Sequence, residues 1–527
     1  MAPGSGAARM LIAGLPFEGG DEALRRYMEL GIGNFVLPGA FLCELPRLGE
    51  LVRIGNELAR TSGKPAPFFA MGGGLEAALI PPELGFLPSP LAIGALPSGA
   101  ARSAARKAGR FLGSVLALFG IRLVFAPRLD VASDPKREGG ILSLFGEDAL
   151  RTGLLGAAYA EGLRSKGVAA CSGLFPGCGC LSAEGRGTLP IVSFPADRLV
   201  AVEMKAFARC VRARVPAISI GRVLVPALEP SKAPAARSAR VIEGRLREGL
   251  GFSGLVIGDR LDEDPAGPGR AAVLGALAGC DLSFVAGPAA AEAAVEALAL
   301  ALASGELPEP RVVVASRRLD HVSRTAAKRA LAVAAEGASP ASEQALRLLE
   351  GKALRRYSSR TIAASMTLLR NEGGYPLPQA RRLVVFFEAP KGSLDSRASD
   401  EIFAILSAGL GEAFMLRVSA DPSPADIDAV SAALGDKKET LAALVLSYDA
   451  HFRPAQEGLV RLIEESSVSL SIAAMRDPYD AAFFPRAAGL LAAYGYSPET
   501  ARAVVSLARS GGALKGRSPV TVLGLEV

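Results

Sequence analysis

Residues Leu250 to Leu261 read LGFSGLVIGDRL. Within them, Gly254 to Asp259 is a nearly continuous apolar run that starts at a glycine and ends at a carboxylate. A strand buried on both faces of a parallel sheet requires such a run. Active sites of parallel barrels form at the C-terminal ends of the strands, so Asp259 is expected to project into a barrel mouth. The alternative is that Asp259 caps the next helix.

The same alternation of short apolar runs with longer helical stretches extends from residue 9 to residue 287, which is typical of repeated βα units. Helices are predicted between the strands, for example over Ala101–Phe119, Asp148–Ser165 and Leu199–Arg212. About eight strands are predicted, the number that closes a TIM-type (β/α)8 barrel. They are Arg9–Pro16, Gly33–Gly39, Pro67–Gly73, Ile121–Val131, Val168–Gly177, Val215–Val223, Gly254–Asp259 and Cys280–Gly287.

A second α/β pattern follows a helical connector and predicts an α/β three-layer sandwich. Small residues and a proline around Gly337–Ser342 mark a hinge. We therefore predict a barrel domain over 1–311, a connector over 312–355 and a C-terminal sandwich domain over 356–527. The strands predicted in the sandwich are Arg382–Glu388, Phe414–Val418, Leu441–Ser447 and Ser469–Ala474.

Composition excludes several classes of function. The 527 residues include only two histidines, His321 and His451, and no tryptophan, so His-rich chemistry is excluded. The net charge of +6 suggests nucleic acid, but the densest basic stretch, Arg317–Arg329, has the pattern of an amphipathic helix. We therefore expect no nucleic-acid partner.

The N-terminal residues lack the three-part layout of a signal peptide. Charged residues interrupt the most apolar stretches, such as Ala289–Ala303, well before the roughly 20 apolar residues that a membrane span needs. We expect a cytoplasmic protein without a transmembrane helix.

Several motifs follow one another along nearly the whole chain. They are GIRLVFAPRLDV at Gly120–Val131, SLFGEDA at Ser143–Ala149, LFPGCGCL at Leu174–Leu181, LGFSGLVIGDRL at Leu250–Leu261 and SMTLLRNEGGYPLP at Ser365–Pro378. In this order they resemble glycoside hydrolase family 3, and within it the two-domain β-N-acetylglucosaminidases (β-N-acetylhexosaminidases) that trim peptidoglycan fragments. The resemblance implies a retaining glycosidase of carbohydrate metabolism and peptidoglycan recycling, with no cofactor and no metal.

The resemblance places Asp259 at the catalytic nucleophile, which attacks the anomeric carbon in retaining hydrolysis. The family's proton-transfer pair, a histidine and an aspartate, falls on Arg186 and Glu184. With a pKa of roughly 12 or more, Arg186 cannot serve as a general acid or base near neutral pH. Glu184 is the remaining candidate for that role.

Most positions that hold the sugar in the family are also replaced. They correspond here to Ser143, Gly173, Leu174, Cys178 and Arg222. Asp130 is retained, either to contact substrate or to anchor a neighbouring loop through backbone N–H groups. Losing several charge-assisted hydrogen bonds would raise the reaction barrier as well as weaken binding.

Three hypotheses follow. The first is a catalytically degenerate homologue, a pseudoenzyme retained for binding a small carbohydrate of the muropeptide type or as a scaffold. The second is an active retaining hydrolase with Asp259 as nucleophile and Glu184, or a C-terminal-domain carboxylate such as Glu388, as acid/base. The third is a metal or redox site built on Cys171, Cys178 and Cys180, with Cys43 as a possible fourth ligand.

Overall fold

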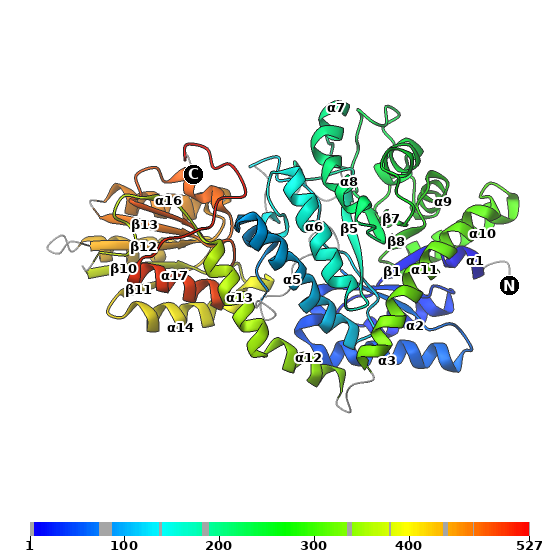
Figure 1. Ribbon diagram of the computed structural model, residues 1–527, viewed down its shortest axis with the longest axis horizontal. Helices are drawn as coiled ribbons and strands as arrows, with labels where there is room; N and C mark the ends of the chain where they lie inside the picture. Colours follow the sequence, from blue (N-terminus) through cyan, green and yellow to red (C-terminus); the bar gives the residue numbers. More distant parts are fainter. Residues whose placement is uncertain are drawn as a thin grey trace. The chain divides into compact units, whose positions relative to one another are not determined.

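The computed structural model describes residues 5–72, 87–135, 140–181, 189–334, 340–378, 381–435, 441–466 and 468–525. The chain divides into two compact units (Figure 1). The barrel unit comprises Met1–Leu79, Ala105–Arg137 and Ala149–Leu348, and the second unit comprises Ile80–Ala104, Glu138–Asp148 and Leu349–Val527. The domain boundaries given above stay predictions.

The barrel unit contains eight parallel strands, each paired with the next, and β8 closes the ring by pairing with β1. This confirms the predicted TIM-type barrel. The strands are β1 Leu11–Gly14, β2 Asn34–Leu37, β3 Phe68–Met71, β4 Leu123–Val124, β5 Ala169–Phe175, β6 Ala217–Ile220, β7 Leu255–Arg260 and β8 Leu282–Val285.

The fourth strand is much shorter than predicted, because β4 pairs only over Leu123–Val124. Pro127 follows closely, and a proline has no N–H group to donate to a strand ladder. Beyond it the chain leaves the regular ladder, and Arg128 makes only an isolated bridge with Gly173. The predicted range Ile121–Val131 was therefore too long.

Helices surround the barrel. Their bounds are α1 Ser5–Ala8, α2 Gly20–Glu29, α3 Leu45–Thr61, α5 Ser98–Leu118, α6 Ala149–Arg164, α7 Ala196–Arg198, α8 Met204–Arg212, α9 Pro268–Ala278, α10 Pro288–Ser304 and α11 Glu309–Ala334. Two π-helical segments, η4 Leu199–Glu203 and η6 Arg240–Gly249, and two short 3-10 turns, η1 Gly39–Cys43 and η5 Ala235–Arg237, complete the unit. Among the described residues no helix is long and apolar enough to cross a membrane.

Buried apolar side chains fill the barrel core, as a (β/α)8 fold requires. They come from all around the ring and include Ile12, Val36, Phe68, Leu123, Cys171, Ala217, Leu255 and Leu282. Side chains along a strand point alternately to its two faces, so each strand contributes side chains to this core. Close packing of the core holds the strands, and therefore the residues at their ends, in fixed positions.

The second unit is an α/β sandwich around a six-stranded sheet, in the order β11-β10-β12-β13-β14-β9. In Figure 1, α14 and α17 lie on one side of this sheet and α16 on the other. The strands are β9 Thr367–Asn371, β10 Arg381–Phe387, β11 Phe414–Val418, β12 Leu441–Ser447, β13 Ser469–Ala474 and β14 Gly489–Ala492. The helices are α4 Pro90–Ala95, α13 Lys352–Ser365, α14 Ser399–Leu410, α15 Pro424–Gly435, α16 Pro454–Glu465 and α17 Pro498–Ser510, with 3-10 turns η3 Ile141–Ser143, η7 Leu394–Ala398, η8 Ala450–Phe452 and η9 Pro478–Phe483. Helix α12 Ala341–Leu349 belongs to the barrel unit except for its last residue.

Two strands of this sheet were not predicted. β9 runs antiparallel to β14 at the edge of an otherwise parallel sheet. Both are short, and β14 reads only GLLA, a run whose period cannot distinguish a strand from a helix. Their pairing depends on contacts between segments that are far apart in sequence.

Candidate active site

A pocket of about 310 Å³ opens at the C-terminal ends of the barrel strands. Its apolar wall is formed by Val36, Phe125, Leu174 and Phe284, and its polar groups are Ser219, Arg222, Asp259, Arg260 and Glu263. Asp259 lies near the end of β7, as the apolar run predicted. The alternative role for Asp259 as a helix cap was wrong, because α9 begins at Pro268 and its N-cap is Gly267.

Asp259 is held by an arginine. Nη1 of Arg237 donates to both carboxylate oxygens of Asp259, at 2.8 and 3.0 Å. Nη2 of the same guanidinium lies 2.6 Å from a carboxylate oxygen of Asp264. The side chains of Asp259, Arg237 and Asp264 are each only 4% exposed, so water screens these charges little.

Two opposing effects act on the pKa of Asp259. Burial raises it, and the charge and hydrogen bonds of Arg237 lower it, with a net shift upward. The hydrogen bonds from Arg237 to both oxygens occupy lone pairs of the carboxylate and withdraw electron density from it. They make Asp259 a weaker nucleophile than a carboxylate without such partners.

Arg222 lies in the same pocket, where the family resemblance places a histidine. Its Nη2 is 3.3 Å from a carboxylate oxygen of Glu263. The Arg222 side chain is 13% exposed, and an arginine remains charged throughout the physiological pH range. It can bind an anion or a hydroxyl, but it cannot transfer a proton at neutral pH.

Asp130 does not line this pocket. It is fully buried and accepts a hydrogen bond from Nε of Arg128 at 2.8 Å. Its Oδ1 accepts the backbone N–H of Cys178 at 2.6 Å. This is the geometry of a loop anchor, because the carboxylate ties the segment after β5 to the segment after β4.

Three other positions named from the sequence have local packing roles. A Cβ at Gly173 would lie 2.1 Å from Oγ of Ser219, so no side chain fits there. Cys178 is buried, and its sulfur would be 2.5 Å from a Cβ at Gly221. Ser143 belongs to the second unit, where its Oγ donates to the carbonyl oxygen of Gly140 at 2.6 Å.

Of the residues considered for proton transfer, the structure describes Glu388, whereas Glu184 and Arg186 lie outside the described residues. Glu388, in the second unit, is paired with Arg417, which also contacts Asp400. Glu184 as acid/base therefore stays a prediction.

Of the cysteines considered for a metal site, Cys171 and Cys178 are buried, and Cys43 and Cys180 are partly exposed. Cys171 belongs to the barrel core. Burial raises the pKa of the Cys171 thiol, and burial together with nearby carboxylates raises the pKa of Cys180 to about 11. Thiolates are the metal-binding form, so both shifts disfavour metal binding. In the described part of the chain, no three His, Cys, Asp or Glu side chains gather with the geometry of a metal site.

The residues that sequence reasoning missed are the partners of Asp259. Arg237 lies 22 positions before Asp259, in the short turn η5, and nothing in its local pattern distinguishes it from other surface arginines. Phe125 and Phe284 likewise reach the pocket only through barrel closure. The sequence carries one signal for this arrangement. Asp264 follows the motif LGFSGLVIGDRL closely, which could have predicted a second carboxylate near Asp259.

A separate polar cluster lies at the C-terminal ends of β12 and β13 in the second unit. His451 Nδ1 is 2.6 Å from Oδ1 of Asp480, and its Nε2 is 3.6 Å from Oδ2 of Asp477. Oγ of Ser447 donates to Asp480 at 2.6 Å. Burial alone would lower the pKa of His451, but the hydrogen bond and charge of Asp480 and the charge of Asp477 outweigh it and raise the pKa. Burial raises the pKa of Asp477 to about 7.

This cluster should make the second unit more stable at about pH 6 than at about pH 8. Both groups have folded-state pKa values above their unfolded values, so the folded state binds more protons and loses this advantage as pH rises through the folded pKa values. His451→Gln should show a smaller fall in melting temperature between these pH values by calorimetry. His321→Gln, the chain's other histidine, is the control and should behave like the wild type. Equal pH dependence in His451→Gln and the wild type would contradict the assignment.

Comparison with known proteins gives a consistent result. Residues 73–322 match the family model described as glycosyl hydrolase family 3 N terminal domain. The structure resembles that of a glycoside hydrolase family 3 β-N-acetylglucosaminidase from Paenibacillus sp. str. FPU-7, with a TM-score of 0.86, 27% identity and full coverage of both chains.

Curated relatives match over shorter stretches. A β-hexosaminidase from Bordetella parapertussis is 33% identical over 190 residues, which are 35% of this chain and 53% of the relative. β-Hexosaminidase A from Pseudoalteromonas piscicida is 27% identical over 275 residues, or 49% of this chain and 45% of the relative. The chain thus spans about half the length of the curated relatives it matches. With the closed barrel, the second α/β unit and Asp259 near the end of β7, these likenesses show a chain whose residues 73–322 match the N-terminal domain of glycoside hydrolase family 3 and whose fold resembles that of a β-N-acetylglucosaminidase of that family.

Proposed function

We propose that this chain is a catalytically degenerate member of glycoside hydrolase family 3 that binds a small glycoside in the Asp259 pocket without hydrolysing it. The observation that carries the proposal is the pairing of Asp259 with Arg237, which engages both oxygens of the nucleophile position. An attacking carboxylate must present a lone pair to the anomeric carbon. Here Arg237 occupies the carboxylate and is itself held between Asp259 and Asp264.

The composition of the pocket supports binding. Its volume of about 310 Å³ lies at the lower end of the range for small-molecule sites, roughly 300–1,000 Å³. Phe125 and Phe284 offer apolar surface, and Ser219, Arg222 and Glu263 offer hydrogen-bonding groups for hydroxyls. Two aromatic rings with a few polar groups suit one sugar ring of the N-acetylglucosamine type.

Peptidoglycan recycling is the role that the branch suggests, and a muropeptide-like ligand is therefore the first to test. The β-hexosaminidase and β-N-acetylglucosaminidase names of the relatives support this choice of ligand. A cytoplasmic location belongs to the same proposal.

The proposal predicts no turnover above background with chromogenic β-N-acetylglucosaminide and β-glucoside substrates. Asp259→Asn should give the same rate as the unmodified chain, because the carboxylate does not act as a nucleophile. The second candidate function is that of an active retaining hydrolase, since Asp259 lies at the C-terminal end of its strand as a nucleophile must. Turnover that Asp259→Asn abolishes would establish that function and overturn the proposed degeneracy.

Binding is measured separately by thermal shift with N-acetylglucosamine and a muropeptide. A ligand that binds only the native state raises the melting temperature saturably. Leu174→Trp should remove this shift by filling the pocket that Leu174 lines. Leu150→Trp, at an exposed position on α6, is the control and should retain it. No saturable shift with either ligand would leave only the scaffold role.

A further inference from the structure

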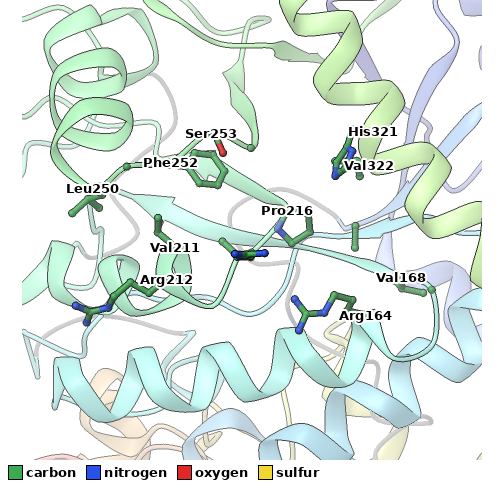
Figure 2. Close-up of a pocket in the computed structure, with 16 residues that line it drawn as sticks. Arg164, Val168, Val211, Arg212, Pro216, Leu250, Phe252, Ser253, His321 and Val322 are labelled. Carbon is green, nitrogen blue, oxygen red and sulfur yellow. The ribbon is translucent and has the colours of Figure 1, made fainter.

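A second pocket, of about 620 Å³, lies at the opposite end of the barrel strands (Figure 2). It is lined by Val168, Pro216 and Gly254, the residues that immediately precede β5, β6 and β7. Gly254 and Asp259 are five strand residues apart, or about 16 Å along β7. The two pockets share no lining residue.

The lining of this pocket is positively charged. Arg164, Arg212, Arg214 and His321 line it, and none of its sixteen described lining residues is acidic. Figure 2 shows that the labelled nitrogen-bearing side chains come from separate elements: Arg164 from α6, Arg212 from the end of α8 and His321 from α11. Arg164 also donates a long hydrogen bond, 3.4 Å, to the carbonyl oxygen of Ala213.

Helix dipoles explain part of this charge. Arg164 and Arg212 lie in the last turns of α6 and α8, where cations stabilise the negative helix end. Each helix end carries about −0.5 charge, which offsets part of the charge of these two arginines. Within the described ranges no carboxylate pairs with Arg212 or Arg214.

Arg214 has an unusual backbone conformation. Its φ is +57°, in the left-handed region that glycine favours and other residues adopt only with backbone strain. The position follows α8 directly and needs no side chain for packing, because Arg214 is exposed. A ligand bound by the guanidinium would explain why an arginine, and not a glycine, occupies this strained position.

Apart from Ser253, the other side chains of the lining are apolar. They include Pro216, Leu250, Phe252 and Val322, with Phe252 and Val322 buried. A ligand that fits must therefore combine an anionic group with an apolar or heteroaromatic body. Arg212 and Arg214, which have no carboxylate partner in the described part of the chain, suit a phosphate monoester dianion, which arginine binds through paired N–H donors.

We propose that this pocket at the N-terminal end of the barrel binds a phosphate monoester with a heteroaromatic or apolar body, such as a nucleoside monophosphate. The site is independent of the Asp259 pocket and of the function proposed for it. It gives the barrel a second ligand whose recognition depends on Arg214, Arg212 and Arg164.

The test is isothermal titration of the full chain at low salt with AMP, adenosine and inorganic phosphate. AMP should bind saturably at one site and more tightly than either of its parts, and its affinity should fall as salt is added. Arg214→Gly should weaken AMP binding about tenfold or more, since a hydrogen-bonded charge pair is lost. The same variant should melt no lower than the wild type, because glycine suits φ +57°.

Two control variants distinguish binding in this pocket from a general attraction of AMP to surface cations or to the Asp259 pocket. Arg209→Gln removes a cation from the same end of α8 without touching the pocket lining, and it should leave AMP affinity unchanged. Asp259→Asn should also leave it unchanged. The proposal is overturned by non-saturable AMP binding, by equal affinity for AMP and inorganic phosphate, or by equal weakening in Arg209→Gln and Arg214→Gly. Loss of AMP binding in Asp259→Asn would overturn it too, because the nucleotide would then belong to the other pocket.

Discussion

Replacing Asp281 with asparagine should lower the free energy of unfolding by about 3–5 kcal/mol. Asp281 is fully buried, and its carboxylate lies 3.0 Å from a guanidinium nitrogen of each of three arginines, Arg247, Arg311 and Arg318. It also accepts the backbone N–H of Val256, at the start of β7, at 2.8 Å. Removing the negative charge leaves three partly buried cations facing one another, of which Arg247 keeps a second carboxylate partner, Glu243, at 3.3 Å.

Urea unfolding followed by far-UV circular dichroism measures this effect, since the chain has no tryptophan to report it by fluorescence. Asp320→Asn is the matched control, because it breaks the solvent-accessible ion pair with Arg9. Its cost should be about 1 kcal/mol or less, as for other surface pairs. Similar costs for Asp281→Asn and Asp320→Asn would show that the buried cluster is no stronger than a surface ion pair.

Replacing Arg237 with methionine should also destabilise the protein by about 3–5 kcal/mol. Methionine keeps much of the length of the side chain but leaves Asp259 and Asp264 buried together without the guanidinium that binds both. The pKa of Asp259 should rise further, since Arg237 lowers it most, with a smaller effect of the charge of Arg222. A raised carboxylate pKa favours the folded state only at acidic pH, so the deficit should be smallest there and grow toward neutral pH.

The double variant Arg237→Met with Asp259→Asn shows whether the loss of stability in Arg237→Met comes from uncompensated buried charge or from lost packing. It removes one of the two uncompensated charges and should recover part of the lost stability. Arg240→Met, at an exposed neighbouring position, should change the stability by no more than about 0.5 kcal/mol. If the double variant were no more stable than Arg237→Met alone, lost packing and not the buried charge would be the cause.

The barrel could be predicted because its strands carry their own signal. LVIGD and similar runs are apolar on both faces, and glycine and helical stretches separate them. The position of Asp259 at a strand end followed from the same pattern. β9 and β14 were missed because a short apolar run shows no reliable period and only its partner makes it a strand.

The chemistry of the site was less predictable. The sequence indicated which family positions had changed, and Arg222 and Leu174 do line the pocket. It did not indicate that Asp259 is bound by Arg237, nor that Asp130 holds the loop at Cys178. Such pairs join residues 22 and 48 positions apart, and no local pattern encodes them.

The (β/α)8 architecture, the α/β character of the second unit and the carboxylate near the end of β7 could all be predicted from the amino-acid sequence. These features depend on local periodicity and on the order of short motifs along the chain. The hydrogen-bonded state of that carboxylate and the arginine-lined pocket at the other end of the barrel became visible in the folded chain alone. Both arise where closure of the ring brings distant side chains together, and the electrostatic energy of a group depends on which charges lie within a few ångströms of it in space.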